Sequence, residues 1–161
     1  MLEDIKYTTQ FIGFTGAMFH FKVSINGQLF DYSMGAGHCT KLNNDKTSVQ
    51  FKITDLEKDD RVSICKAIFG YHRSISIYEY ENLKIVYVKR PDLKEVLNCL
   101  FLDSMARDQC FNDWCLDFGY SDDSIITKNI YDDCIQNSIR LKKALGSKYH
   151  DINEYIRDLE L

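Results

Sequence analysis

The chain has 161 residues, of which 45% are hydrophobic and 27% are charged, with a formal net charge of −4. These values are ordinary for a globular domain, and one Pro and eight Gly exclude collagen, proline-rich linkers and most disorder. No apolar run approaches the roughly 20 residues that span a membrane, and the first residues lack the basic and apolar regions of a signal peptide. We therefore expect a single cytoplasmic domain over residues 1–161 that makes no membrane contact.

Six cysteines accompany this composition, and without an export signal we expect them to be free thiols. No Cys-x-x-Cys spacing occurs, and His38-Cys39 is the only His/Cys doublet, so four convergent zinc ligands are not predicted. Most of the cysteines lie beside Leu, Ile or Phe, as buried small hydrophobic residues do. The six are Cys39, Cys65, Cys99, Cys110, Cys115 and Cys134. We expect neither a metal nor a cofactor.

The first third of the chain has the pattern of an antiparallel sheet. Residues 5–12 and 19–25 alternate apolar and polar side chains, which is typical of strands with one buried face. Asn26-Gly27 supplies the two positive φ angles of a type I′ turn, and residues 29–34 form the partner strand.

The next residues, up to position 90, continue as mainly β structure with one short helix. The glycines of Gly35-Ala36-Gly37 predict a turn with positive φ, and the polar residues 39–48 predict a loop. A short strand is expected at 49–53, and a helix from Asp55 or Asp59 to Gly70. The alternation in 75–80 and 83–88 predicts a second hairpin, turned at Glu81-Asn82.

From Pro91 the periodicity is helical, so residues 91–161 are expected to form helices. A helix at 110–118, closed by Gly119, carries Trp114 on an apolar stripe with its neighbours Phe111 and Phe118. The longest helix is expected at 122–145, capped by Ser121 or Asp122, with Ile126 on its buried face. A final helix is expected at 151–161. The predicted fold class is α+β: an N-terminal antiparallel sheet packed by C-terminal helices.

The negative charge is concentrated in residues 103–133. This segment contains eight Asp and only two basic residues, Arg107 and Lys128, so its local net charge is −6. One interpretation is a set of helix caps and a solvated face. The other is an acidic surface that attracts a basic partner. The residues expected to be exposed, and therefore the candidate partner-binding residues, are Asp108, Asp113, Asp117, Asp122 and Asp123.

Catalytic and nucleic-acid-binding patterns are weak. Gly35-Ala36-Gly37 lacks the Lys-Ser/Thr of a phosphate-binding P-loop, and no motif places a nucleophile near His38. The aspartates do not have the alternate spacing of a calcium loop. An isoelectric point of about 5.5 and the lack of a basic stripe argue against direct nucleic-acid binding. We expect a binding protein rather than an enzyme, with no catalytic residues.

Two blocks of sequence resemble a group of small phage and prophage accessory proteins. The first is strand, Asn-Gly turn and strand, ending in Met34-Gly35-Ala36-Gly37-His38. The second runs from Pro91 and contains Phe118-Gly119-Tyr120-Ser121-Asp122-Asp123-Ser124, followed by Ile125 where the group usually has a basic residue. The resemblance covers about half of the chain, and residues 41–90 look like an insertion. Members of the group look similar to proteins of anti-CRISPR neighbourhoods.

This resemblance implies a phage-encoded inhibitor that binds a host CRISPR-Cas effector stoichiometrically in the bacterial cytoplasm. CRISPR effectors hold nucleic acid in positively charged channels, so an acidic patch is expected to block such a surface. Two alternatives remain open: an enzyme acting on nucleic acid or a signalling nucleotide, and an interaction or assembly protein of the phage.

Overall fold

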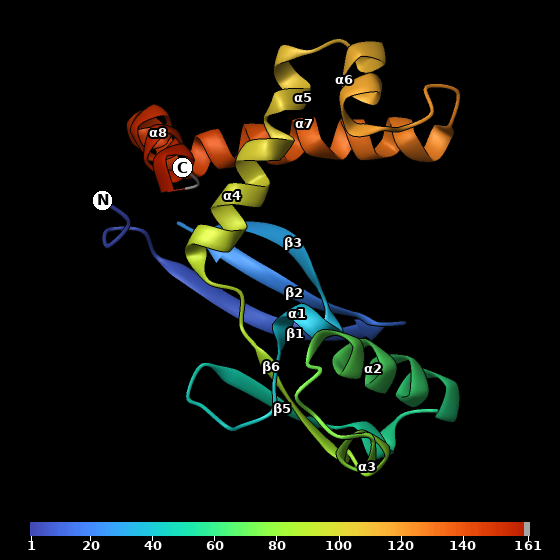
Figure 1. Cartoon of the computed structure of the whole chain (residues 1–161). Coiled ribbons are helices and arrows are strands. Elements are labelled where there is room, and N and C mark those ends of the chain that lie inside the picture. The colour runs from blue at the N-terminus through green and yellow to red at the C-terminus, as the bar shows by residue number, and fades with distance from the viewer. Residues whose placement is uncertain (160–161) are drawn as a thin grey trace. The chain divides into compact units, whose positions relative to one another are not determined.

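The structure is a computed structural model that describes residues 1–159, and it has the predicted α+β fold, with an N-terminal antiparallel sheet and C-terminal helices (Figure 1). The strands are β1 (Tyr7–Thr15), β2 (Met18–Ile25), β3 (Gln28–Gly35), β4 (Thr40–Lys41), β5 (Ser48–Lys52) and β6 (Ile85–Lys89). The helices are α1 (Ala36–Cys39), α2 (Lys58–Tyr71), α3 (Ile77–Glu81), α4 (Leu93–Asp103), α5 (Met105–Asp108), α6 (Phe111–Phe118), α7 (Ile125–Leu145) and α8 (Tyr149–Leu159). Single 3₁₀ turns lie at Ile53–Asp55 and Gly146–Lys148.

The chain divides into two compact units. The helical unit comprises Met1–Thr8, Ser24–Phe30 and the chain from Asp92 onward. The mixed unit comprises Thr9–Val23 and Asp31–Pro91. Each unit is described by itself below.

The N-terminal hairpin is confirmed. The strand order of its sheet is β1-β2-β3, and the alternate residues of β2, namely Phe19, Phe21, Val23 and Ile25, are at most 1% exposed. At the turn, Asn26 has φ 47° and Gly27 has φ 85°, the positive pair that a type I′ turn requires. On the other face of β2, His20 Nδ1 lies 2.7 Å from Ser33 Oγ on the neighbouring strand β3.

The core of the mixed unit is rich in aromatic side chains. The Phe11 ring contacts those of Phe19, Phe21 and Phe51, and the Phe19 ring also contacts that of Phe51, with ring centroids 5.5–6.1 Å apart. Such pairs add about 0.5–1.5 kcal/mol each beyond the burial of area. The second sheet of this unit has the order β4-β6-β5, with β6 antiparallel to both neighbours.

The predicted second hairpin is wrong. Residues 77–81 form α3, and its N-terminus is a capping box: Ser76 Oγ accepts from Glu79 N, while the Glu79 carboxylate accepts from Ser76 N. This reciprocal pair stabilises a helix start that alternation alone does not reveal. Only β6 forms from the second half of that segment, and it pairs with β4 and β5 instead. Residues 1–90 therefore contain three helices rather than one.

The turn predicted at Gly35–Gly37 is also wrong, because Ala36–Cys39 is the short helix α1 and neither glycine has a positive φ. Gly37 is required for close packing. A Cβ atom there would lie 2.5 Å from Tyr71 Cβ and 2.8 Å from the Ala67 carbonyl oxygen of α2. The missing side chain thus lets α1 approach α2.

The helical unit is organised around α7, which α4, α5, α6 and α8 all contact (Figure 1). The apolar stripe of α4 is buried: Val96, Leu97, Leu100 and Phe101 are at most 6% exposed. Asp92 caps this helix, with Glu95 completing a capping box. The start of α7 differs from the prediction, because Ser124 rather than Ser121 or Asp122 is the N-cap and accepts from Thr127 N. Asp122 is therefore not used as a cap.

Candidate protein-binding surface

Helix α6 is anchored to the start of α7 by a small aromatic core. Trp114 is 2% exposed, as expected. The centroid of its indole lies 5.0 Å from the centroid of the Tyr120 ring and 5.3 Å from that of the Tyr131 ring. Ala106, Cys115 and Tyr131 complete the buried cluster. This core fixes one face of α6 against α7 and leaves the opposite face to solvent.

Polar contacts hold the same segment in place. The Tyr131 hydroxyl donates to the Gln109 carbonyl oxygen at 2.8 Å, and the Lys128 ammonium lies over the rings of Phe111 and Tyr131, 5.0 and 4.8 Å from their centroids. Gly119 closes α6 with φ 74°, a left-handed conformation that favours glycine. The segment from α6 to the first turn of α7 is therefore a defined surface rather than a loose loop.

Large apolar side chains project from this segment into solvent. Leu116 and Ile125 are each 80% exposed, and Ile126 is 73% exposed. Phe118 and Tyr120 are 40% and 42% exposed. The prediction that Ile126 is buried is therefore wrong. Single exposed hydrophobic residues are common, but five within eleven consecutive residues is a concentration, and concentrated exposed apolar area is typical of interaction sites.

Acidic side chains alternate with these apolar ones. Asp113 and Asp117 lie four residues apart on α6, and Asp122 and Asp123 follow in the loop before α7; all four are exposed. We call the combined feature the acidic–apolar surface, and its members are Asp113, Leu116, Asp117, Phe118, Tyr120, Asp122, Asp123, Ile125 and Ile126.

Two of the acids make local hydrogen bonds that orient them. Asp117 accepts from Gln109 Nε2, and Asp123 accepts from Ser121 Oγ. Within residues 1–159, Asp113 and Asp122 make no hydrogen bond or ion pair of their own. Their charges face water, where they contribute little to stability and remain available to a partner.

Within residues 1–159, none of these four carboxylates forms an ion pair. Between Arg107 and Arg140 the only basic residue is Lys128, and its ammonium pairs with Asp132 Oδ1 at 3.5 Å. The acidic–apolar surface therefore combines four unbalanced carboxylates with exposed apolar area.

The remaining aspartates of the acidic segment lie elsewhere. Asp103 accepts from Asn137 Nδ2 at 3.2 Å and from the Cys134 thiol at 3.6 Å, and burial raises its pKa above the ordinary value for a carboxyl group. Asp108 is exposed, as expected, but lines a polar pocket beside α8. The candidate residue Asp108 therefore lines a pocket that none of the other four candidate aspartates lines.

Other places in the molecule offer less chemistry. In residues 1–159, no group of three or more His, Cys, Asp or Glu side chains is arranged to hold a metal ion, and the six cysteines are free thiols. None of the described helices is both long enough and apolar enough to cross a bilayer.

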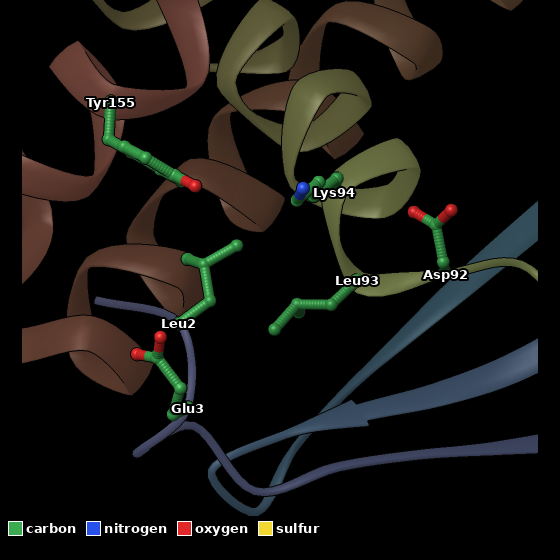
Figure 2. Close-up of a pocket in the computed structure, with 6 residues that line it drawn as sticks. All are labelled: Leu2, Glu3, Asp92, Leu93, Lys94 and Tyr155. Carbon is green, nitrogen blue, oxygen red and sulfur yellow. The ribbon is translucent and has the colours of Figure 1, made fainter. Parts of the chain in front are cut away.

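The hollow drawn in Figure 2 has a volume of about 500 Å³, and the Leu2 and Leu93 side chains point into it. Its two carboxylates already have local roles, because Asp92 caps α4 and Glu3 pairs with the N-terminal ammonium. Among the described residues, no hydrogen bond or ion pair joins Lys94 or Tyr155 to another residue that lines the hollow. We therefore assign no reaction to this hollow.

Comparison with known proteins adds no relative: no family model, curated protein or solved structure matches the chain. Any function must therefore be inferred from the residues themselves. From the sequence, the four acids were named but the apolar half of the surface was missed: Ile126 was expected on a buried face, because helical periodicity does not show whether another element covers that face, and the exposure of Leu116 and Ile125 was not considered.

Proposed function

We propose that this chain acts by stoichiometric binding to another protein through the acidic–apolar surface. The observation that carries the proposal is the alternation of exposed apolar side chains with unbalanced carboxylates on a segment fixed by the Trp114 core. Protein interfaces bury aromatic and aliphatic anchors at their centre and place charges where they steer association and exclude wrong partners.

The surface also defines the chemistry of its partner. A complementary partner surface carries lysine or arginine side chains around an apolar patch that receives Leu116 and Ile125. The nucleic-acid channel of a CRISPR effector is strongly basic, and the resemblance of two sequence blocks to phage accessory proteins favours such an effector as the partner. The chain would then block the channel by occupying part of it, as a phage-encoded inhibitor does.

The charge distribution favours local occlusion over imitation of a nucleic acid. The chain carries only −4 overall, whereas double-stranded DNA carries one charge per about 1.7 Å. The contact must therefore depend on apolar burial as well as on charge, and both kinds of residue must contribute to affinity.

The test is titration of the protein into nuclease assays of purified CRISPR effectors from several types. We expect inhibition of at least one effector that is complete near one equivalent and shows no turnover. Asp113→Lys combined with Asp117→Lys should relieve the inhibition. The matched control is Glu154→Lys with Asp158→Lys, an exposed acidic pair with the same spacing on α8. Catalytic, substoichiometric inhibition, or a lack of inhibition of every effector tested, would contradict the proposal.

A further inference from the structure

A second candidate site lies where α5, α7 and α8 meet, and it has the opposite charge. It is a pocket of about 290 Å³ in the helical unit, close to the lower end of the range of about 300–1,000 Å³ that small-molecule sites occupy. Three cationic side chains line it from three different helices: Arg107 from α5, Lys142 from α7 and Arg157 from α8.

Helical spacing explains why these residues converge. Ser138 and Lys142 lie four residues apart on α7, and Tyr149, Asn153 and Arg157 follow one another at intervals of four on α8. Residues four apart share one face of a helix. Two stripes that are each partly polar therefore face each other across the pocket.

The cations of the pocket are not neutralised by the described part of the chain. Within residues 1–159, neither Arg107 nor Arg157 forms an ion pair, and Lys142 contacts only the Tyr149 ring, 5.7 Å from its centroid. Among the described lining residues, Asp108 is the one carboxylate. The formal excess is thus two positive charges with His150 neutral, and because the three exposed cations line one hollow, their fields add there and attract an anion.

The inner wall of the pocket supplies an unused hydrogen-bond donor. Ser138 is 0% exposed, and its Oγ has no hydrogen-bond partner among residues 1–159. A buried hydroxyl without a partner is destabilising, and an anion in the pocket would accept the hydrogen bond that Ser138 Oγ does not make within the chain. Asn153 Oδ1 is also buried and unpartnered, and rotating that amide by half a turn presents Nδ2 to the pocket instead. By contrast, the nearby Ser104 hydroxyl already donates to the Phe101 carbonyl oxygen.

We propose that this pocket binds the phosphate group of a small phosphate monoester. A monoester carries close to two negative charges at neutral pH, which matches the excess charge of the lining. Guanidinium groups bind phosphate oxygens through paired N–H donors, and the Ser138 hydroxyl and the Lys142 ammonium supply further donors. The Tyr149 ring, 8% exposed, and Met105 give the pocket an apolar wall for the organic part of the ligand. The site does not depend on the acidic–apolar surface, so either proposal can fail alone.

The test is calorimetric titration of the full chain at constant ionic strength with three probes: inorganic phosphate, glycerol 3-phosphate and dimethyl phosphate. We expect saturable binding of the first two and at least tenfold weaker binding of the singly charged diester. Arg157→Gln and Lys142→Gln should each weaken phosphate binding about tenfold or more, because a charge-assisted hydrogen bond is lost. Arg73→Gln and Lys66→Gln, exposed cations of the mixed unit, are the matched controls and should leave binding unchanged.

Ser138→Ala separates a ligand-binding role from a structural one. Without phosphate, this variant should be at least as stable as the wild type, because an unpartnered buried hydroxyl is removed. With phosphate, its gain in melting temperature should be smaller than that of the wild type. The proposal is overturned if phosphate and its monoester do not saturate a site, if the control variants weaken binding equally, or if the diester binds as tightly as the monoester.

Discussion

Replacing Trp114 by alanine tests whether the aromatic core fixes the acidic–apolar surface. The indole is 2% exposed, and its ring is within 6.4 Å of four aromatic neighbours, Phe111, Phe118, Tyr120 and Tyr131. Truncating a buried aromatic side chain of this kind costs about 3–5 kcal/mol. For a chain of this length, that loss corresponds to a decrease in melting temperature of roughly 6–20 °C.

The assay is urea unfolding followed by far-ultraviolet circular dichroism, because the variant lacks the only tryptophan. Leu116→Ala is the matched control, since Leu116 lies on the same helix and is 80% exposed. We expect its stability to differ from the wild type by no more than about 0.5 kcal/mol. A loss below 1 kcal/mol for Trp114→Ala would refute the burial argument and would mean that nothing holds the binding surface in one conformation.

Two further predictions concern packing and thiol chemistry. Gly37→Ala should destabilise the protein by about 1–3 kcal/mol, because its Cβ would meet Tyr71 Cβ at 2.5 Å. The control is Gly70→Ala in α2, where a Cβ meets nothing within 4 Å, and this variant should be neutral or stabilising. Equal urea midpoints for the two variants would contradict the close approach of α1 to α2. In the folded protein Cys134 should be alkylated much more slowly than the exposed Cys110, because burial and the neighbouring Asp103 carboxylate raise the pKa of Cys134 to about 12. Because the thiolate is the reactive form, the alkylation rate of Cys134 should rise about tenfold per pH unit between pH 8 and 10. The rate is measured by mass spectrometry of labelled peptides. A rate that does not depend on pH would contradict the raised pKa of Cys134.

The elements that the sequence predicted correctly are those specified by local signals. The Asn26-Gly27 turn and the alternation of Phe19, Phe21 and Val23 together specify the β2–β3 hairpin, since turn type and buried face both depend on adjacent residues. The helices α4 and α6 were likewise predicted from apolar periodicity and from the glycine that follows α6.

The failures have two physical origins. Residues 77–81 alternate like a strand, but the capping box at Ser76 and Glu79 is a competing local signal that favours a helix. The β6 strand pairs with residues from Thr40 to Lys52, and such non-local pairing leaves no mark within either segment. Gly37 was predicted to lie in a turn with positive φ, whereas the structure shows that its missing side chain allows α1 to pack against α2.

The candidate sites could be predicted only in part, because they too depend on contacts between segments that are distant in the sequence. The excess of aspartate is a property of composition, so the acids of the binding surface could be named in advance. The exposure of Ile125 and Ile126 depends on whether another element covers the first turn of α7, which periodicity does not encode. The cationic pocket requires the pairing of α7 with α8, and before that pairing was known Lys142 could be assigned only to the negative end of its own helix.

The most direct test of the binding surface is the association rate of the protein with an inhibited effector, measured at low and at physiological salt. Asp113→Lys with Asp117→Lys is compared with Glu154→Lys with Asp158→Lys, after both variants are shown to melt at the wild-type temperature. The charges of a steering surface act over the Debye length, about 30 Å at 0.01 M salt and 8 Å at 0.15 M. We therefore expect the α6 variant to associate at least about tenfold more slowly at low salt, with a smaller deficit at physiological salt, while the α8 variant associates like the wild type. Wild-type association by the folded α6 variant at both salt concentrations would contradict the claim that the acidic–apolar surface is the contact.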